Sequence, residues 1–193
     1  MTRDTDTGAH SGPAVLRKTV ALVGMMGAGK TAVGRAVAEM LHVPFLDSDH
    51  EIERAAAMAI SEIFARDGEP FFRARETEVI GRLMQDRVCI LSTGGGAFMS
   101  EGNRALMSER GVSVWLDADL ELLWSRVRHK DTRPLLRGPD PYGTLRRLYD
   151  TRVPIYAQAD VTVRSEPGLP IEAMAHRVID ALARRPDVLE VSQ

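Results

Sequence analysis

Along the chain, short runs of consecutive apolar residues alternate with longer segments in which apolar residues recur every three or four positions. A run of four or five apolar residues that ends at glycine or at a polar cluster is typical of a parallel strand buried on both faces. The longer segments have the period of helices that pack one face on a core. The predicted strands are 19–23, 43–46, 88–91, 112–116 and 161–163. The predicted helices are 31–41, 50–84 with breaks near 60–61 and 67–70, 100–110, 119–127, 144–157 with an interruption at Pro154, and 171–183.

The remaining segments have neither pattern. Residues 1–17 are rich in Thr, Asp, Gly, Ser and Pro, and we expect them to form a flexible tail, as we do residues 186–193. Residues 128–142 contain three prolines and several charges, which predicts a mobile loop. This leaves 18–185 as a single α/β domain with a parallel sheet. In such sheets ligands bind beyond the carboxyl ends of the strands.

Composition excludes several classes of protein. The chain has 193 residues, of which 44% are hydrophobic and 27% are charged, as in an ordinary globular domain. The 25 basic and 27 acidic residues nearly balance, which argues against a general nucleic-acid-binding protein. Cys89 is the single cysteine and excludes an internal disulfide framework. No apolar run reaches the roughly 20 residues that span a bilayer, and no signal peptide is visible. We therefore expect a cytoplasmic protein without a membrane partner. We also expect a monomer with no nucleic-acid partner.

Arginine supplies nearly all of the positive charge. Only Lys18, Lys30 and Lys130 are lysines, so the other 22 basic residues are arginines. With so many arginines, the default interpretation of any one of them is a solvated surface residue. A lysine inside a motif is correspondingly more informative.

One such motif follows the first predicted strand. Gly24–Thr31 has the sequence Gly-Met-Met-Gly-Ala-Gly-Lys-Thr and matches the phosphate-loop pattern G-x-x-x-x-G-K-[ST] in full. Its glycines let backbone N–H groups turn toward phosphate oxygens, and the helix N-terminus that follows favours an anion. Lys30 is placed to reach the β- and γ-phosphates, and the Thr31 hydroxyl to bind Mg²⁺. The motif predicts a site for ATP with Mg²⁺.

A pair of carboxylates ends the second predicted strand. Asp47 and Asp49 flank Ser48, and a purely structural interpretation is that Ser48 or Asp49 caps the next helix. Beside a phosphate loop a second interpretation gains weight, because alternate residues leaving a strand point in different directions. Asp47 then faces the metal through water. Asp49 orients or deprotonates an attacking hydroxyl.

Taken together, the motifs of this chain resemble those of the shikimate kinase family. They occur in that family's order and spacing between about residues 19 and 163. The resemblance implies a three-layer P-loop kinase fold, with a five-stranded parallel sheet flanked by helices, a helical substrate-binding insertion at about 48–85 and a lid at about 128–142. The matching segments are Gly24–Thr31, Leu46–Asp49, Asp67–Glu69 with Phe71–Arg73, Gly94–Gly96, Thr132–Leu136 and Arg152–Tyr156.

The resemblance also implies roles for residues that the chain's composition leaves undistinguished. Two arginines, Arg73 and Arg152, would bind the substrate carboxylate, for which a guanidinium fork is well suited. Glu76 lies one helical turn past Arg73, within reach to hold it in position. The resemblance also implies that shikimate contacts Gly94, Gly95 and Gly96. ATP would contact Gly27, Ala28, Gly29, Lys30, Thr31 and Ala32. Arg126 would contact the adenine, and the lid residue Arg133 would contact ATP at the transferred phosphoryl group.

The resemblance implies an ATP-dependent kinase that phosphorylates the 3-hydroxyl of shikimate, a step toward chorismate and the aromatic amino acids. Lys30, Asp49 and Arg133 would be its catalytic residues. Two alternatives stay open from the residues alone. One is a kinase of another small hydroxy acid such as gluconate, because a paired-arginine site does not exclude every sugar acid. The other is a regulatory module that binds nucleotide without turning it over.

Overall fold

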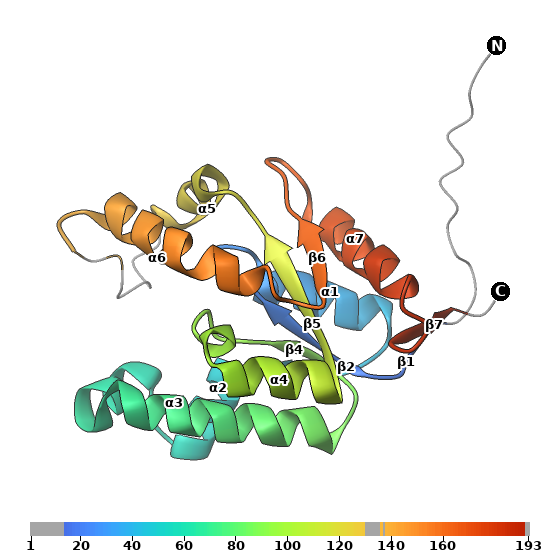
Figure 1. The fold of residues 1–193 in the computed structure, drawn as a ribbon, viewed down its shortest axis with the longest axis horizontal. Helices are drawn as coiled ribbons and strands as arrows, with labels where there is room; N and C mark the ends of the chain where they lie inside the picture. The colour runs from blue at the N-terminus through green and yellow to red at the C-terminus, as the bar shows by residue number, and fades with distance from the viewer. Residues whose placement is uncertain (1–13, 130–135, 137, 192–193) are drawn as a thin grey trace, which may run out of the picture.

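The computed structural model describes residues 14–129, 136 and 138–191. Within them, five parallel strands form one sheet in the order β3-β4-β2-β5-β6 (Figure 1), which confirms the predicted parallel sheet. The central strand is β2, with β4 on one side and β5 on the other. The carboxyl ends of these strands therefore converge near the loop that follows β2. The strands are β2 (Thr19–Val23), β3 (Phe45–Asp47), β4 (Ile90–Ser92), β5 (Gly111–Asp117) and β6 (Val161–Arg164).

Helices cover both faces of the sheet and give three layers. On one face α1 packs beside α7, and on the other α4 packs against β5 with α3 alongside it (Figure 1). The α6 helix contacts α5 and the short turn η1. The bounds are α1 (Lys30–Met40), α2 (Ser48–Ala56), α3 (Ile60–Asp86), η1 (Ala97–Met99), α4 (Glu101–Arg110), α5 (Leu120–Val127), α6 (Pro141–Tyr156) and α7 (Ile171–Ala183).

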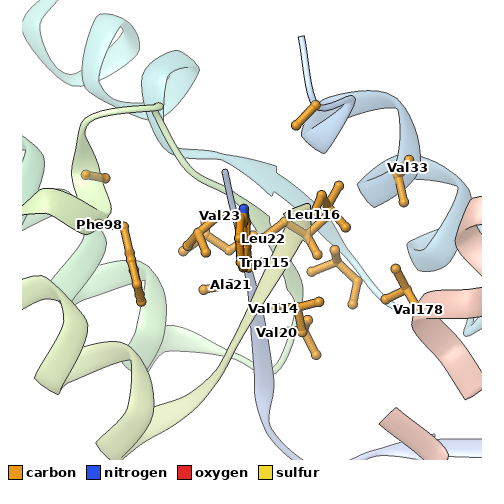
Figure 2. Packing of buried hydrophobic residues seen from close by; sticks show 14 of the residues in the cluster. Val20, Ala21, Leu22, Val23, Val33, Phe98, Val114, Trp115, Leu116 and Val178 are labelled. Atoms are coloured by element: carbon orange, nitrogen blue, oxygen red, sulfur yellow. The ribbon is translucent and has the colours of Figure 1, made fainter. Parts of the chain in front are cut away.

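The core lies on both sides of β2, whose five residues are all buried. Figure 2 shows Val20–Val23 between Phe98 on one side and Val33 with Val178 on the other. An uninterrupted apolar strand suits this position because helices cover both of its faces. The core thus holds rigid the strand from which the phosphate loop emerges.

The helical insertion between β3 and β4 breaks where the sequence predicts. α2 ends at Ala56, and α3 begins at Ile60 with Glu62 accepting a hydrogen bond from the Ala59 N–H at 2.9 Å. Within α3, Gly68 has φ 80° and ψ 173°, which interrupts the helical backbone. A left-handed φ is a conformation that glycine adopts without steric cost. Pro70 follows near the start of the second segment, where a missing N–H does not break the helix.

The structure differs from the prediction at the two ends of the domain. Both 14–16 and 189–191 fall in the predicted tails, yet β1 (Ala14–Leu16) pairs with β7 (Leu189–Val191) as an antiparallel ladder. These strands are only three residues long, too short for an alternating pattern to be recognised. Leu189 is 1% exposed, and its burial anchors the pair.

The structure also differs in the region of α6. Pro154 lies inside a continuous helix instead of interrupting it. The burial of Leu145 and Tyr156, which are both fully buried, offsets the backbone hydrogen bond that Pro154 cannot make. The predicted mobile loop at 128–142 overlaps α6 from Pro141 onward. Residues 130–135 and 137 of that loop lie outside the described residues. Among the helices that are described, none is long and apolar enough to cross a membrane.

Candidate active site

The phosphate loop joins β2 to α1 in the conformation that its glycines allow. Gly24, Gly27 and Gly29 have φ values of 139°, 83° and 93°, which residues with a side chain rarely adopt. Lys30 folds back over the loop and donates hydrogen bonds to the carbonyl oxygens of Gly24 and Met25, at 2.8 and 3.0 Å. A positively charged group and a helix N-terminus thus face the same space, the combination that binds a phosphate.

A cavity of about 520 Å³ opens above this loop. Its walls come from the ends of β2, β3 and β4 and from the segment between β6 and α7, as ligand sites in parallel sheets do. Every predicted ATP contact in the described residues lines it, which brings together Gly27–Ala32 and Arg126. The cavity also contains Asp47, Asp49, Ser92, Thr93, Gly94, Gly95, Ser165, Leu169, Ile171 and Met174.

Asp47 links the phosphate loop to the insertion. Its Oδ2 accepts a hydrogen bond from Thr31 Oγ1 at 3.1 Å, and Ser92 Oγ lies 3.3 Å from the same hydroxyl. Its Oδ1 caps α2 by accepting from the N–H groups of Asp49 and His50. The interpretation that Ser48 or Asp49 caps this helix is therefore wrong, because α2 begins at Ser48, two residues before the predicted start, and Asp47 is its cap. Both oxygens of Asp47 are held in place by these contacts.

Asp49 stands at the boundary between the phosphate loop and the glycine segment. Burial raises the pKa of its carboxyl above the usual value of 3.8, and the charge of Asp47 raises it further against the opposing effect of Lys30. A methyl group on Gly94 would lie 2.7 Å from Asp49 Oδ1, so a glycine is needed there for the carboxylate to fit. The environment therefore makes Asp49 a stronger base than a solvated aspartate.

A second cavity, of about 340 Å³, lies beyond the glycine segment and contains Arg73 and Arg152. Arg73 donates to Glu76 Oε2 at 2.7 Å and to Glu69 Oε1 at 3.2 Å, which confirms that Glu76 is placed to hold it. Burial disfavours the charged form of Arg73, but Glu76 and Glu69 outweigh this effect and raise its pKa. Glu76 itself is 1% exposed, and burial raises its pKa despite the neighbouring guanidinium.

The three glycines separate the two cavities, and each meets different side chains. A methyl group on Gly96 would lie 2.5 Å from Arg73 Nη2, whereas one on Gly95 would have its nearest neighbour, Arg152 Nη1, at 3.7 Å. Gly94 donates its N–H to Ser48 Oγ at 3.1 Å. The absence of a side chain thus makes room for the Asp49 carboxylate at Gly94 and for the Arg73 guanidinium at Gly96.

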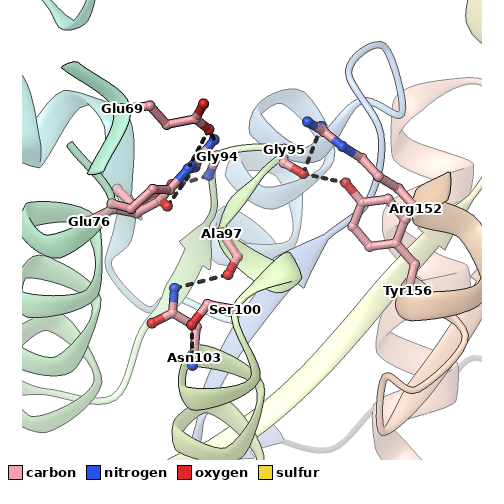
Figure 3. Close-up of polar contacts among 11 residues, drawn as sticks. Glu69, Glu76, Gly94, Gly95, Ala97, Ser100, Asn103, Arg152 and Tyr156 are labelled. Carbon is pink, nitrogen blue, oxygen red and sulfur yellow. Dashed lines mark hydrogen bonds and ion pairs between the residues drawn. The ribbon is translucent and has the colours of Figure 1, made fainter. Parts of the chain in front are cut away.

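Helix α6 reaches the glycine segment from the side opposite α3 (Figure 3). Arg152 Nη1 donates to the Gly95 carbonyl oxygen at 3.3 Å, and the Tyr156 hydroxyl donates to the same oxygen. The Gly95 carbonyl oxygen is therefore held by two side chains of α6. The sequence quoted for the family, Arg152–Tyr156, contains this tyrosine, but its role was not predicted.

Arg126 lies on α5 at the far side of the larger cavity. It donates to the Gly27 carbonyl oxygen at 3.3 Å and to Ser165 Oγ at 3.2 Å, and burial lowers its pKa. This places a flat guanidinium beside the phosphate loop, where a base could stack on it. Arg133 lies outside the described residues.

Two further polar residues at the site were missed by sequence reasoning. Ser92 follows the buried run of β4 and lies beside Thr31. Asn103 is 1% exposed, donates to the Ala97 carbonyl oxygen at 2.9 Å and lines the smaller cavity. Neither stands in a pattern that distinguishes it from a strand end or a surface helix, and only the fold brings them to the site.

Comparison with known proteins gives concordant results. The family model described as shikimate kinase matches residues 26–183. A shikimate kinase of Ruegeria pomeroyi is 66% identical over 181 residues, which cover 94% of this chain and 93% of that protein. The solved structure of a shikimate kinase from Acinetobacter baumannii in complex with shikimate is 40% identical, with a TM-score of 0.82 over 86% of this chain and 93% of that one.

A more distant likeness shows the fold alone. A gluconokinase structure from Sinorhizobium meliloti has a TM-score of 0.58 at 19% identity, and covers 88% of this chain and 93% of that one. The family match, by contrast, begins within the phosphate loop at residue 26 and spans both cavities and the helices that frame them. The chain belongs to the shikimate kinase family.

Proposed function

We propose that this protein transfers the γ-phosphoryl group of ATP to the 3-hydroxyl of shikimate, giving shikimate 3-phosphate and ADP on the route to chorismate. The observation that carries the proposal is the pairing of two cavities across the glycine segment. One is lined by a complete phosphate loop, and the other by Arg73 and Arg152. Asp49 and Gly95 lie where the two approach each other.

The smaller cavity suits a substrate with one carboxylate. Two guanidinium groups from different helices, Arg73 on α3 and Arg152 on α6, supply the charge-assisted hydrogen bonds that offset the carboxylate's desolvation. Glu76 fixes Arg73 from behind with a 2.7 Å hydrogen bond, so less side-chain freedom remains to be lost on binding. The N–H groups of Gly95 and Gly96 add donors for the carboxylate or ring hydroxyls.

Asp49 supplies the acceptor for the proton of the 3-hydroxyl. As the hydroxyl oxygen forms its bond to the γ-phosphorus, the proton moves to a carboxylate oxygen of Asp49, and the bond to the ADP oxygen breaks. The raised pKa of Asp49 strengthens this acceptor, provided that the carboxyl is ionised at the working pH.

Lys30 stabilises the negative charge that spreads over the phosphoryl oxygens during transfer. Its hydrogen bonds to the carbonyl oxygens of Gly24 and Met25 hold the ammonium group at the mouth of the loop. For Arg133 the assignment rests on the Thr132–Leu136 motif, which gives it the same charge-stabilising role and gives its segment the part of a closing lid. Arg126 would stack on the adenine.

The oxygen groups beside the phosphate loop fit Mg²⁺. The described residues contain no cluster of three or more His, Cys, Asp or Glu side chains able to hold a metal by themselves. Mg²⁺ is instead commonly held by one carboxylate or hydroxyl together with phosphates and water. Thr31 would hold it directly and Asp47 through water; the two oxygens, Thr31 Oγ1 and Asp47 Oδ2, lie 3.1 Å apart beside the loop. When bound, the metal would neutralise charge on the β- and γ-phosphates.

Substrate-dependent release of ADP tests the proposal directly. A coupled assay with ATP and either shikimate, quinate or gluconate should show turnover with shikimate that exceeds the other two by at least tenfold. Turnover with gluconate instead would assign the protein to the first alternative. ATP binding without turnover of any of the three would favour the regulatory module. The complete set of Lys30, Asp47 and Asp49 around one cavity favours turnover.

A further inference from the structure

Two side chains of α6 converge on one backbone oxygen. The Tyr156 hydroxyl and Arg152 Nη1 both donate to the Gly95 carbonyl oxygen (Figure 3). Arg152 is also the proposed ligand of the substrate carboxylate, so it would contact both the substrate and the Gly95 oxygen. Tyr156 is fully buried and has no access to a ligand. Its hydroxyl therefore acts on the protein alone.

The position of the Tyr156 hydroxyl is fixed by packing. The ring lies between Phe98 and Trp115, with both centroid distances 6.2 Å and interplanar angles of 17° and 21°. Burial raises the pKa of Tyr156 to about 12, so the hydroxyl keeps its proton, and remains a donor, throughout the pH range of enzymes. A rigid ring with a permanent donor holds the Gly95 carbonyl oxygen in one direction.

This direction determines where the next N–H group points. In a planar trans peptide the C=O of one residue and the N–H of the next point in opposite directions. With the Gly95 oxygen turned toward α6, the Gly96 N–H is turned away from α6. Gly96 lies against Arg73 and lines the smaller cavity. The hydrogen bond from Tyr156 thus sets the orientation of a donor on the substrate side.

We propose that Tyr156 is a positioning residue for the substrate pocket: its hydroxyl locks the Gly95–Gly96 peptide so that the Gly96 N–H is aimed at the carboxylate-bearing substrate. The inference rests on the proposed function, because it takes the smaller cavity as the shikimate site. It assigns Tyr156 an effect on shikimate binding and none on nucleotide binding.

The test is Tyr156→Phe, which removes the hydroxyl and keeps the ring between Phe98 and Trp115. We expect the KM for shikimate to rise about five- to tenfold, the effect of misaligning one hydrogen-bond donor. The KM for ATP should stay within twofold. Calorimetric titration of shikimate without ATP should show the same loss of affinity. The control is Thr19→Val, which removes another buried hydroxyl, one that donates to the Arg87 carbonyl oxygen at the far end of β2.

The outcomes separate the two proposals. If the wild-type protein does not turn over shikimate, the proposed function fails, and the positioning role, which rests on it, fails with it. If it does, a shikimate KM for Tyr156→Phe within twofold of wild type overturns the positioning role. A parallel rise of both KM values overturns it as well, because that pattern indicates a general loosening of the fold. Thermal unfolding of Tyr156→Phe close to that of Thr19→Val, with only the former losing shikimate affinity, supports the proposal.

Discussion

The phosphate loop and the glycine segment Gly94–Gly96 of this protein are held in place in opposite ways. In the phosphate loop the main contacts join residues five and six positions apart, from Lys30 to the carbonyl oxygens of Met25 and Gly24. In the substrate pocket, contacts to Gly95 join residues 57 and 61 positions apart, through Arg152 and Tyr156. A local site depends on its own loop, whereas an assembled site depends on how whole helices pack. We therefore expect substitutions in the phosphate loop to lower kcat, and substitutions around the glycine segment to raise the KM for shikimate.

The largest effect is expected in the local site, for Lys30→Ala. Removing the ammonium group takes away one of the positive charges that stabilise the phosphoryl oxygens, and we expect kcat to fall by about 10²- to 10³-fold. Steady-state ADP release measures it. The control is Lys18→Ala, whose lysine pairs with Asp187 on the surface and should leave kcat unchanged. A kcat for Lys30→Ala within fivefold of wild type would contradict the role.

Asp49→Asn probes the boundary between the sites. We expect kcat to fall at least tenfold, because the amide does not accept the proton, while ATP still binds in a direct titration. The unliganded variant should be more stable near neutral pH. In the wild type, the ionised Asp49 carboxyl, whose folded-state pKa is raised, lowers the free energy of unfolding above that pKa. Below the pKa of the unfolded state the carboxyl is protonated in both states and has no such cost. The stability gained by Asp49→Asn should therefore disappear in acid. Thermal melts at several pH values measure this gain, roughly 2–4 °C for each kcal/mol in a domain of this size.

The same carboxyl predicts the acid limb of the pH profile. Since Asp49 acts in its ionised form, kcat/KM should fall as the pH drops through its folded pKa, which lies above the ordinary value of 3.8. A wild-type limb at or below that ordinary value would contradict the assignment. The residual activity of Asp49→Asn should lack this limb.

In the assembled site, Arg73→Ala should raise the KM for shikimate by about 30-fold, the range for losing a charged hydrogen bond. The KM for ATP should change little. Arg75→Ala is a matched control, because Arg75 lies two residues away on the same helix and pairs with Glu78 at the surface. A defect mainly on the nucleotide side would refute the comparison between the two regions.

The smallest effect compares two adjacent glycines. Gly96→Ala would place a methyl group 2.5 Å from Arg73 Nη2, so the guanidinium must move, and we expect a roughly tenfold higher KM for shikimate. Gly95→Ala meets its nearest atom at an ordinary 3.7 Å and should change this KM less than twofold. Equal effects at the two positions would show that backbone freedom, and not the space for Arg73, explains the glycines.

The difference between the regions also explains what could be predicted from the sequence. The phosphate loop and the buried strand before it carry their signal in consecutive residues, and both are confirmed. Glu76 was predicted to hold Arg73 because one helical turn separates them. Asn103 was not recognised because no pattern distinguishes it from other polar residues of a surface helix. Tyr156 was not recognised, since its partner Gly95 is brought to it by packing that local patterns do not encode. The same holds for β1 and β7, whose pairing joins the two ends of the domain.

That pairing has a practical consequence for engineering. Ala14 and Val191 are directly opposite each other in the ladder, at the end of the domain from which β2 enters the sheet (Figure 1). The catalytic cavities lie at the other end of the strands. A two-residue turn joining Val191 to Ala14 would therefore close a β-hairpin, and a circularly permuted chain could use this connection with its new ends opened in another loop. For the same reason, a surface linker attached next to Ala14 or Val191 would lie away from both cavities.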